Sequence, residues 1–189
     1  MKCILCFGDS NTFGYDPRSY FGSQYPADVR WTGLLQNVGW EVANCGQNGR
    51  CIPREPQFPA VADLLRRVRA DVVTVMLGSN DLLNGASADQ TAKQMGTLLR
   101  YIKKDTGTAN ILLIAPPPIQ LGDWVQTREL IDESKHLSEL YHALADQLGI
   151  AFADAGEWGV ALTFDGVHFS PEGHMAFAEG LIHTLDSLK

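Results

Sequence analysis

The sequence predicts a single α/β domain in which helices cover both faces of a doubly wound, five-stranded parallel sheet, a three-layer flavodoxin-like arrangement. Two observations lead to this prediction. Five short apolar runs recur along the 189 residues, and amphipathic helical patterns separate them. Continuously apolar strands are typical of a parallel sheet buried on both faces. The strand order 2-1-3-4-5 suits five strands best and sets the first strand between the second and the third.

Each strand is predicted from an apolar run that turn residues interrupt. The first run ends at Gly8, and the third, which is β-branched and continuous, ends at Gly78. A proline run that begins at Pro116 stops the fourth. The expected strands are Cys3–Phe7, Trp40–Asn44, Val72–Leu77, Ile111–Ile114 and Ile150–Ala153.

The helices are predicted from apolar residues at positions i, i+3, i+4 and i+7. Ser87 and Ser170 are N-cap residue types, and Pro171 suits the first position of the last helix. The expected helices are Asp28 to Val38, a segment around Val61 to Val68, one from Ser87 through Ile102, one from about Thr127 to Leu148, and one that follows Ser170.

Composition and charge limit the class of protein. With 45% hydrophobic and 20% charged residues, the chain supports one core, so we expect one domain over residues 1–189. A net charge of -7 argues against nucleic acid or an anionic membrane as partner. No apolar segment approaches the roughly 20 residues of a membrane-spanning helix. The first residues do not resemble a signal peptide, and we expect a cytoplasmic protein.

The cysteines and histidines do not predict a metal site. Cys3 and Cys6 have C-x-x-C spacing, but residues three apart in a strand point to opposite faces, so both are expected to be structural. A disulfide between Cys45 and Cys51 stays open, although the expected compartment disfavours it. His168 and His174 lack an evident third ligand. We expect no metal and no cofactor.

Three loops are expected to meet at the carboxyl edge of the sheet. The turn Gly8-Asp9-Ser10-Asn11 places a hydroxyl at the end of the first strand, where open α/β sheets bind ligands. Loops rich in glycine and asparagine follow the second and third strands. They are Asn44 to Arg50 and Gly78-Ser79-Asn80-Asp81, and the predicted strand order brings both beside Ser10.

These groups suit acyl transfer by a serine nucleophile. Ser10 needs a general base, an acid that orients the base, and donors for an oxyanion. In Asp165-Gly166-Val167-His168, the aspartate can fold back onto the histidine and leave Nε2 free to face Ser10. The segment from Asp154 to Asp165 spans up to roughly 36 Å when extended, which is enough to cross the strand ends.

Four blocks of the sequence resemble, in order and spacing, the conserved blocks of the GDSL or SGNH hydrolases. The blocks are Gly8-Asp9-Ser10-Asn11, Asn44 to Gly49, Gly78-Ser79-Asn80-Asp81 and Asp165-Gly166-Val167-His168. Together they span nearly the whole chain. The fourth position of the first block is Asn11, where leucine is common in the family, and we expect this departure to affect local packing.

The resemblance implies roles for individual residues. Ser10 would be the nucleophile, and Asp165 and His168 would complete the triad. The oxyanion donors would be the backbone N–H groups of Ser10 and Gly49 and the side-chain amide of Asn80. Gly46 is a rival for the role of Gly49, which the alignment of the second block favours.

A closer resemblance is to the bacterial arylesterase and acyltransferase branch, through segments such as Asp28-Val29-Arg30-Trp31-Thr32-Gly33 and Ala115-Pro116-Pro117-Pro118. It implies action on short-acyl esters and acyl transfer to alcohols. Some members are oligomers, so a homo-oligomer stays open. Substrate contacts are expected from Asp9, Asn11, Trp31 and Asn48, although Trp31 suits the core equally well.

The leading hypothesis is therefore a serine esterase that hydrolyses small short-acyl, acetyl or aryl carboxylic esters. Carbohydrate acetylesterase, thioesterase and lysophospholipase activities are alternatives within the same family. A non-catalytic flavodoxin-like binding module is an alternative of another class. It is disfavoured because the first turn lacks the G-x-G-x-x-G pattern and because Asp9 would repel a phosphate.

Overall fold

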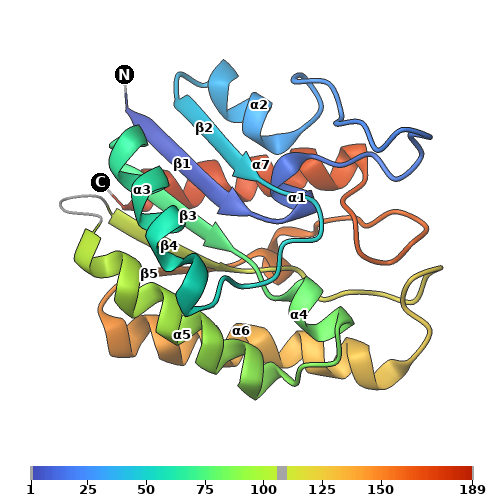
Figure 1. Ribbon diagram of the computed structural model, residues 1–189. Coiled ribbons are helices and arrows are strands. Elements are labelled where there is room, and N and C mark those ends of the chain that lie inside the picture. Colours follow the sequence, from blue (N-terminus) through green and yellow to red (C-terminus); the bar gives the residue numbers. More distant parts are fainter. Residues whose placement is uncertain (1, 106–109, 189) are drawn as a thin grey trace.

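The sheet has the predicted topology. A computed structural model describes residues 2–105 and 110–188. Its five strands are all parallel and lie in the order β2-β1-β3-β4-β5, which confirms the predicted order (Figure 1). The strands are β1 (Cys3–Gly8), β2 (Glu41–Gly46), β3 (Val72–Met76), β4 (Asn110–Ala115) and β5 (Ala151–Asp154).

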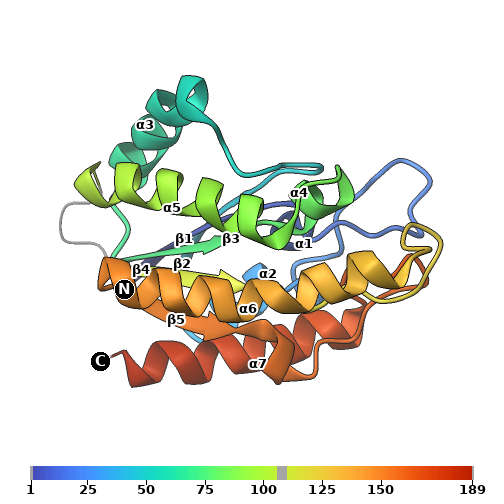
Figure 2. The ribbon, with the colours of Figure 1, turned by 90° about the horizontal axis from the view of Figure 1, so that it is seen from below.

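Helices cover both faces of the sheet. On one face lie α2 and α7, and on the other lie α3, α5 and α6, so the sheet forms the middle of three layers (Figure 2). The helices are α1 (Ser10–Phe13), α2 (Trp31–Asn37), α3 (Phe58–Val68), α4 (Ser79–Leu83), α5 (Ala88–Asp105), α6 (Arg128–Leu148) and α7 (Pro171–Ser187), with short 3₁₀ turns at Glu55–Gln57 and Ala155–Trp158.

The core consists of one apolar cluster on each side of the sheet. Alternate residues of β1 divide between the two, as the pleat of a strand requires. Leu5 and Phe7 face α3, α5 and α6, whereas Ile4 and Cys6 face α2 and α7. Cys3 packs on the side opposite to Cys6, and all four cysteines are free thiols.

Several element ends differ from the prediction. Helix α2 begins at Trp31 and not at Asp28, because Val29 and Arg30 donate to the carbonyl of Pro26 in a preceding turn. Strand β2 continues to Gly46 in register with β1. The N-cap of α7 is as predicted, since the Ser170 hydroxyl accepts from the Gly173 N–H at 3.1 Å.

Two short helices were not predicted, and both begin just beyond a strand end. They are α1, directly after β1, and α4, after β3. Each is a single turn that carries a candidate site residue, Ser10 or Asn80. Along the residues that the structure describes, no helix is long and apolar enough to cross a membrane.

Candidate active site

Ser10 is held at the end of β1 by a turn that needs glycine. A side chain at Gly8 would place its Cβ 2.0 Å from Thr12 Oγ1 and 2.8 Å from the carbonyl oxygen of Met76, so the tight crossing excludes any other residue. The Asp9 carboxylate then accepts from the Asn11 N–H at 2.9 Å and caps α1. This cap fixes the orientation of the serine that follows it.

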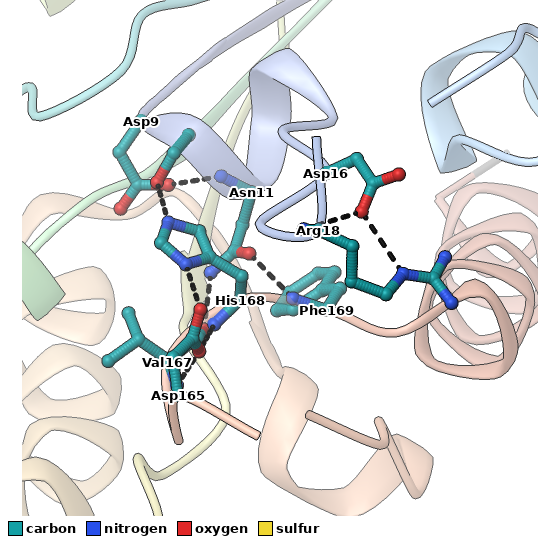
Figure 3. Close-up of polar contacts among 9 residues, drawn as sticks. Asp9, Asn11, Asp16, Arg18, Asp165, Val167, His168 and Phe169 are labelled. Carbon is teal, nitrogen blue, oxygen red and sulfur yellow. Dashed lines mark hydrogen bonds and ion pairs between the residues drawn. The ribbon is translucent and has the colours of Figure 1, made fainter. Parts of the chain in front are cut away.

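A chain of hydrogen bonds joins Ser10 to His168 and Asp165. Figure 3 shows the bond between His168 and Asp165. His168 Nδ1 lies 2.7 Å from Asp165 Oδ2, and Nε2 lies 3.0 Å from Ser10 Oγ. A carboxylate can only accept, so Nδ1 carries the proton and Nε2 accepts from the serine hydroxyl. All three side chains are buried, which shields these hydrogen bonds from water.

Asp165 stays ionised although it is buried. Burial raises the pKa of this carboxyl, but hydrogen bonds from the His168 ring and from the backbone N–H groups of His168 and Val167 lower it to about 2. The two backbone bonds measure 2.8 and 2.9 Å and both reach Oδ1, so Oδ2 is left for the imidazole. The negative charge therefore faces His168 at any working pH.

The turn that presents His168 is braced by the loop after β4. Gly166 has a φ of +81°, and a Cβ there would lie 2.1 Å from the carbonyl oxygen of Gln120. Gln120 donates to Gly166, and Trp124 donates to the carbonyl of Asp165 at 3.2 Å. Glycine is thus required both by the backbone angle and by the close packing of the two loops.

The three residues expected to supply oxyanion donors, Ser10, Gly49 and Asn80, line one cavity. The Ser10 N–H opens α1, where helical N–H groups have no partner within the helix. Gly49, with a φ of +70°, and Asn80 line the same cavity as Ser10. The rival Gly46 is engaged elsewhere, because its N–H donates to Asn44 Oδ1 at 2.9 Å.

Arg50 connects the ends of β1 and β2. Its guanidinium lies 4.4 Å above the Phe7 ring and donates to the carbonyls of Gly8 and Cys45. Its own carbonyl accepts from Asn80 Nδ2 at 3.1 Å, which orients the amide and leaves its second N–H for other partners. Asp81 binds the same loop through the N–H of Ile52.

The cavity beside Ser10 is small and partly aromatic. Its volume is about 250 Å³, and its walls come from the segments that follow each of the five strands. The rings of Tyr15 and Trp124 lie 4.7 and 5.0 Å from the His168 ring. The sequence analysis did not identify these two side chains. Aromatic residues in loops that follow strand ends were the available signal. The lining residues are Ser10, Tyr15, Asn48, Gly49, Asn80, Trp124 and His168.

The structure places one of the four expected substrate contacts at the cavity. Asn48 lines the cavity, but Asp9, Asn11 and Trp31 are buried away from it. The Asp9 carboxylate caps α1, and the Asn11 amide bonds backbone groups on either side of His168. Trp31 belongs to the core, where its ring lies 4.8 Å from that of Phe177. Of the two alternatives for Trp31, the structure therefore shows the core position.

His174 also belongs to the core. Its ring packs against Tyr25 and Phe169, and the Trp31 N–H approaches its Nδ1 at 3.4 Å. Burial, followed by the positive charges of Arg30 and His168, lowers its pKa to about 3. The ring is therefore neutral. Within residues 2–105 and 110–188, no three His, Cys, Asp or Glu residues form a group that could hold a metal ion.

Comparison with protein families agrees with this geometry. The model of the GDSL-like lipase/acylhydrolase family matches residues 6–176, which contain every residue of the hydrogen-bonded chain. The chain belongs to this family. Membership makes it an esterase-type hydrolase of the GDSL class. No curated protein sequence matches the chain.

Solved structures with similar folds include two esterases. A carbohydrate acetylesterase from Sinorhizobium meliloti, Est24, is 27% identical with a TM-score of 0.87. The aryl esterase of M. smegmatis is 29% identical with a TM-score of 0.84. Each comparison covers 100% of this chain and 100% of the other. The similarity therefore extends over the full length of both chains.

The buried Asp9 predicts a measurable dependence of stability on pH. Burial raises its pKa from 3.8 to about 6, against the opposing effects of the Asn11 N–H, His168 and Arg50. Between these values the folded chain binds the proton and the unfolded chain does not, so the free energy of unfolding falls as pH rises. Two pKa units correspond to on the order of 3 kcal/mol.

We therefore expect Asp9→Asn, which keeps the capping oxygen, to remove this decrease. Urea unfolding of both proteins at pH 4 and pH 7 would measure it, with Asp63→Asn as control because Asp63 is exposed. If wild-type protein and Asp9→Asn lose the same stability between these pH values, then the shift assigned to Asp9 is wrong.

Proposed function

We propose that this GDSL-family chain is a serine esterase that forms an acyl-enzyme intermediate on Ser10. The observation that supports the proposal is the continuous chain of hydrogen bonds from Asp165 through His168 to the Ser10 hydroxyl, which ends at the wall of a cavity. Side chains of these three types in this order activate serine nucleophiles in several unrelated folds.

Acylation would proceed by attack of Ser10 Oγ on the ester carbonyl carbon. The hydroxyl proton passes to His168 Nε2, and the resulting imidazolium is stabilised by the ionised Asp165. The carbonyl oxygen becomes an oxyanion that accepts from the N–H groups of Ser10 and Gly49 and from Asn80 Nδ2. When the intermediate collapses, the alcohol leaves with the proton that His168 took, and the acyl group stays on Ser10.

Deacylation would repeat these steps with water as the nucleophile. His168 accepts a proton from the water as its oxygen attacks the acyl carbon, and the proton returns to Ser10 Oγ as the acid leaves. An alcohol in place of water would give acyl transfer by the same route. The rings of Tyr15 and Trp124 flank His168, which limits the water that reaches it.

The cavity favours small, uncharged esters. Its volume of about 250 Å³ is below the roughly 300–1,000 Å³ of sites for drug-sized ligands. Of its lining residues, none carries a carboxylate, ammonium or guanidinium group. Aromatic rings and asparagine amides suit an acetyl or other short acyl group next to an aryl or sugar alcohol. The similarity to an aryl esterase and to a carbohydrate acetylesterase supports this substrate class.

We expect Ser10→Ala to lose nearly all turnover of p-nitrophenyl acetate. Loss of a serine nucleophile costs about 10⁶ in kcat where it has been measured. Release of p-nitrophenolate would be followed with wild-type protein, Ser10→Ala and the exposed control Ser187→Ala. Turnover by Ser10→Ala at the wild-type rate would rule out Ser10 as the nucleophile.

Asn80→Ala tests the side-chain oxyanion donor. We expect kcat to fall by about 10²–10³, the usual effect of removing one such donor, with little change in KM because the donor acts in the transition state. Asn37→Ala, at the exposed end of α2, is the matched control. An unchanged kcat in Asn80→Ala would mean that the amide serves the Arg50 carbonyl alone.

The small cavity predicts a preference for short acyl chains. For p-nitrophenyl esters from acetate to octanoate, we expect kcat/KM to be highest at acetate or propionate and to fall as the chain exceeds the cavity. Acetylated xylo-oligosaccharides, assayed in parallel for released acetate, would separate aryl from sugar leaving groups. A maximum at octanoate would contradict the preference for short chains.

A further inference from the structure

The side chain of Asn11 joins the helix of Ser10 to the segment of His168. Its Nδ2 donates to the carbonyl of Val167 at 3.0 Å, and its Oδ1 accepts from the Phe169 N–H at 2.9 Å (Figure 3). These backbone groups belong to the residues immediately before and after His168. Asn11 is 4% exposed and does not line the cavity, so it does not contact substrate.

Asn11 is itself held on both sides. Its N–H donates to Asp9 Oδ1 at 2.9 Å, and its carbonyl accepts from the indole N–H of Trp31 at 2.9 Å. Trp31 is anchored in the core against Phe177, so its bond ties the backbone of Asn11 to α2. The bridge from Asn11 therefore starts from a fixed point, one residue from the nucleophile.

This bridge is the direct polar connection between the two sides of the site. Apart from the contact between Ser10 and His168, the two bonds of Asn11 are the hydrogen bonds that join α1 to residues 165–169 in the described parts of the chain. Gln120 and Trp124 brace the same turn, but their bonds reach Asp165 and Gly166 from the opposite side. They do not connect it to Ser10.

The chemistry of the amide makes the bridge specific to asparagine. It supplies one donor and one acceptor to two buried backbone groups of opposite kind. Leucine, which the family name G-D-S-L places at this position, has nearly the same shape but could serve neither group. Both would then be buried without partners, and the segment would relax to satisfy them.

We propose that Asn11 is a positioning residue that sets the separation and alignment of Ser10 Oγ and His168 Nε2. This inference rests on the proposed function, because it assigns a geometric task within the same triad. Proton transfer needs close alignment, and displacement of a catalytic group by 1 Å can cost about 100-fold in rate. Asn11 thus takes a role that leucine cannot fill.

The test is Asn11→Leu, with Asn37→Leu as the matched control on the exposed end of α2. For p-nitrophenyl acetate we expect kcat of Asn11→Leu to fall by about ten- to a hundredfold. KM should stay within about twofold of wild type, because the lost interaction affects the transition state and not substrate binding. The rate at which a fluorophosphonate labels Ser10 should fall with kcat, and Asn37→Leu should match the wild type in all three measurements.

A second variant covers the case in which Asn11→Leu does not fold. Asn11→Asp keeps the shape of the side chain and the acceptor for Phe169, but it turns an oxygen toward the Val167 carbonyl. Circular dichroism melting identifies which variants are folded. We expect Asn11→Asp to lose kcat and labelling rate in the same way, without a comparable change in KM.

The kcat and KM of the folded variants distinguish a positioning residue from a substrate contact. Wild-type kcat in a folded Asn11→Leu or Asn11→Asp would overturn the proposal, and so would a raised KM with unchanged kcat, which would make Asn11 a substrate contact. In both cases an active wild type would leave the proposed function intact. A wild-type protein that neither hydrolyses the ester nor reacts with the probe would overturn the proposed function, and this inference with it.

Discussion

Gly8, the last residue of β1, is paired with Gly46 of β2 on one side and with Met76 of β3 on the other. This register brings three chain segments out of the sheet at the same level, one with Ser10, one with Gly49 and one with Asn80. The sheet register thus brings the residues expected as oxyanion donors to the cavity beside the Ser10 hydroxyl. The central position of β1 is thus the constraint on which the site depends, and the crossover helices on both faces hold it there.

The fourth segment arrives from the far edge of the sheet and has to be fixed by contacts instead of strand pairing. After β5 the chain crosses the strand ends, and the turn from Asp165 to His168 is held on one side by the loop after β4 and on the other by Asn11. The pKa values of the two buried carboxyls beside the site shift in opposite directions. Hydrogen bonds keep the pKa of Asp165 near 2, whereas burial raises that of Asp9 to about 6.

The strand order was predictable because continuous apolar runs and their glycine or proline ends are local signals of a parallel sheet. The convergence of the loops followed from that order alone. The single-turn helices α1 and α4 were not predictable, since four or five residues carry no periodicity. Trp31 shows a different limit, since helical spacing identifies a buried face but not whether the core or a substrate covers it. Asn11 was expected to affect packing, and its two hydrogen bonds to a segment more than 150 residues away leave no trace in the local sequence.

The proposed mechanism requires that Ser10 carries the acyl group during turnover. Its most direct test is mass spectrometry of the protein quenched with acid during hydrolysis of p-nitrophenyl acetate. We expect a mass increase of one acetyl group on the peptide that contains Ser10, present during turnover and lost when substrate is exhausted. Acetyl groups found on other residues, or turnover with no acetylated peptide under conditions that trap the intermediate in a serine esterase assayed alongside, would contradict it.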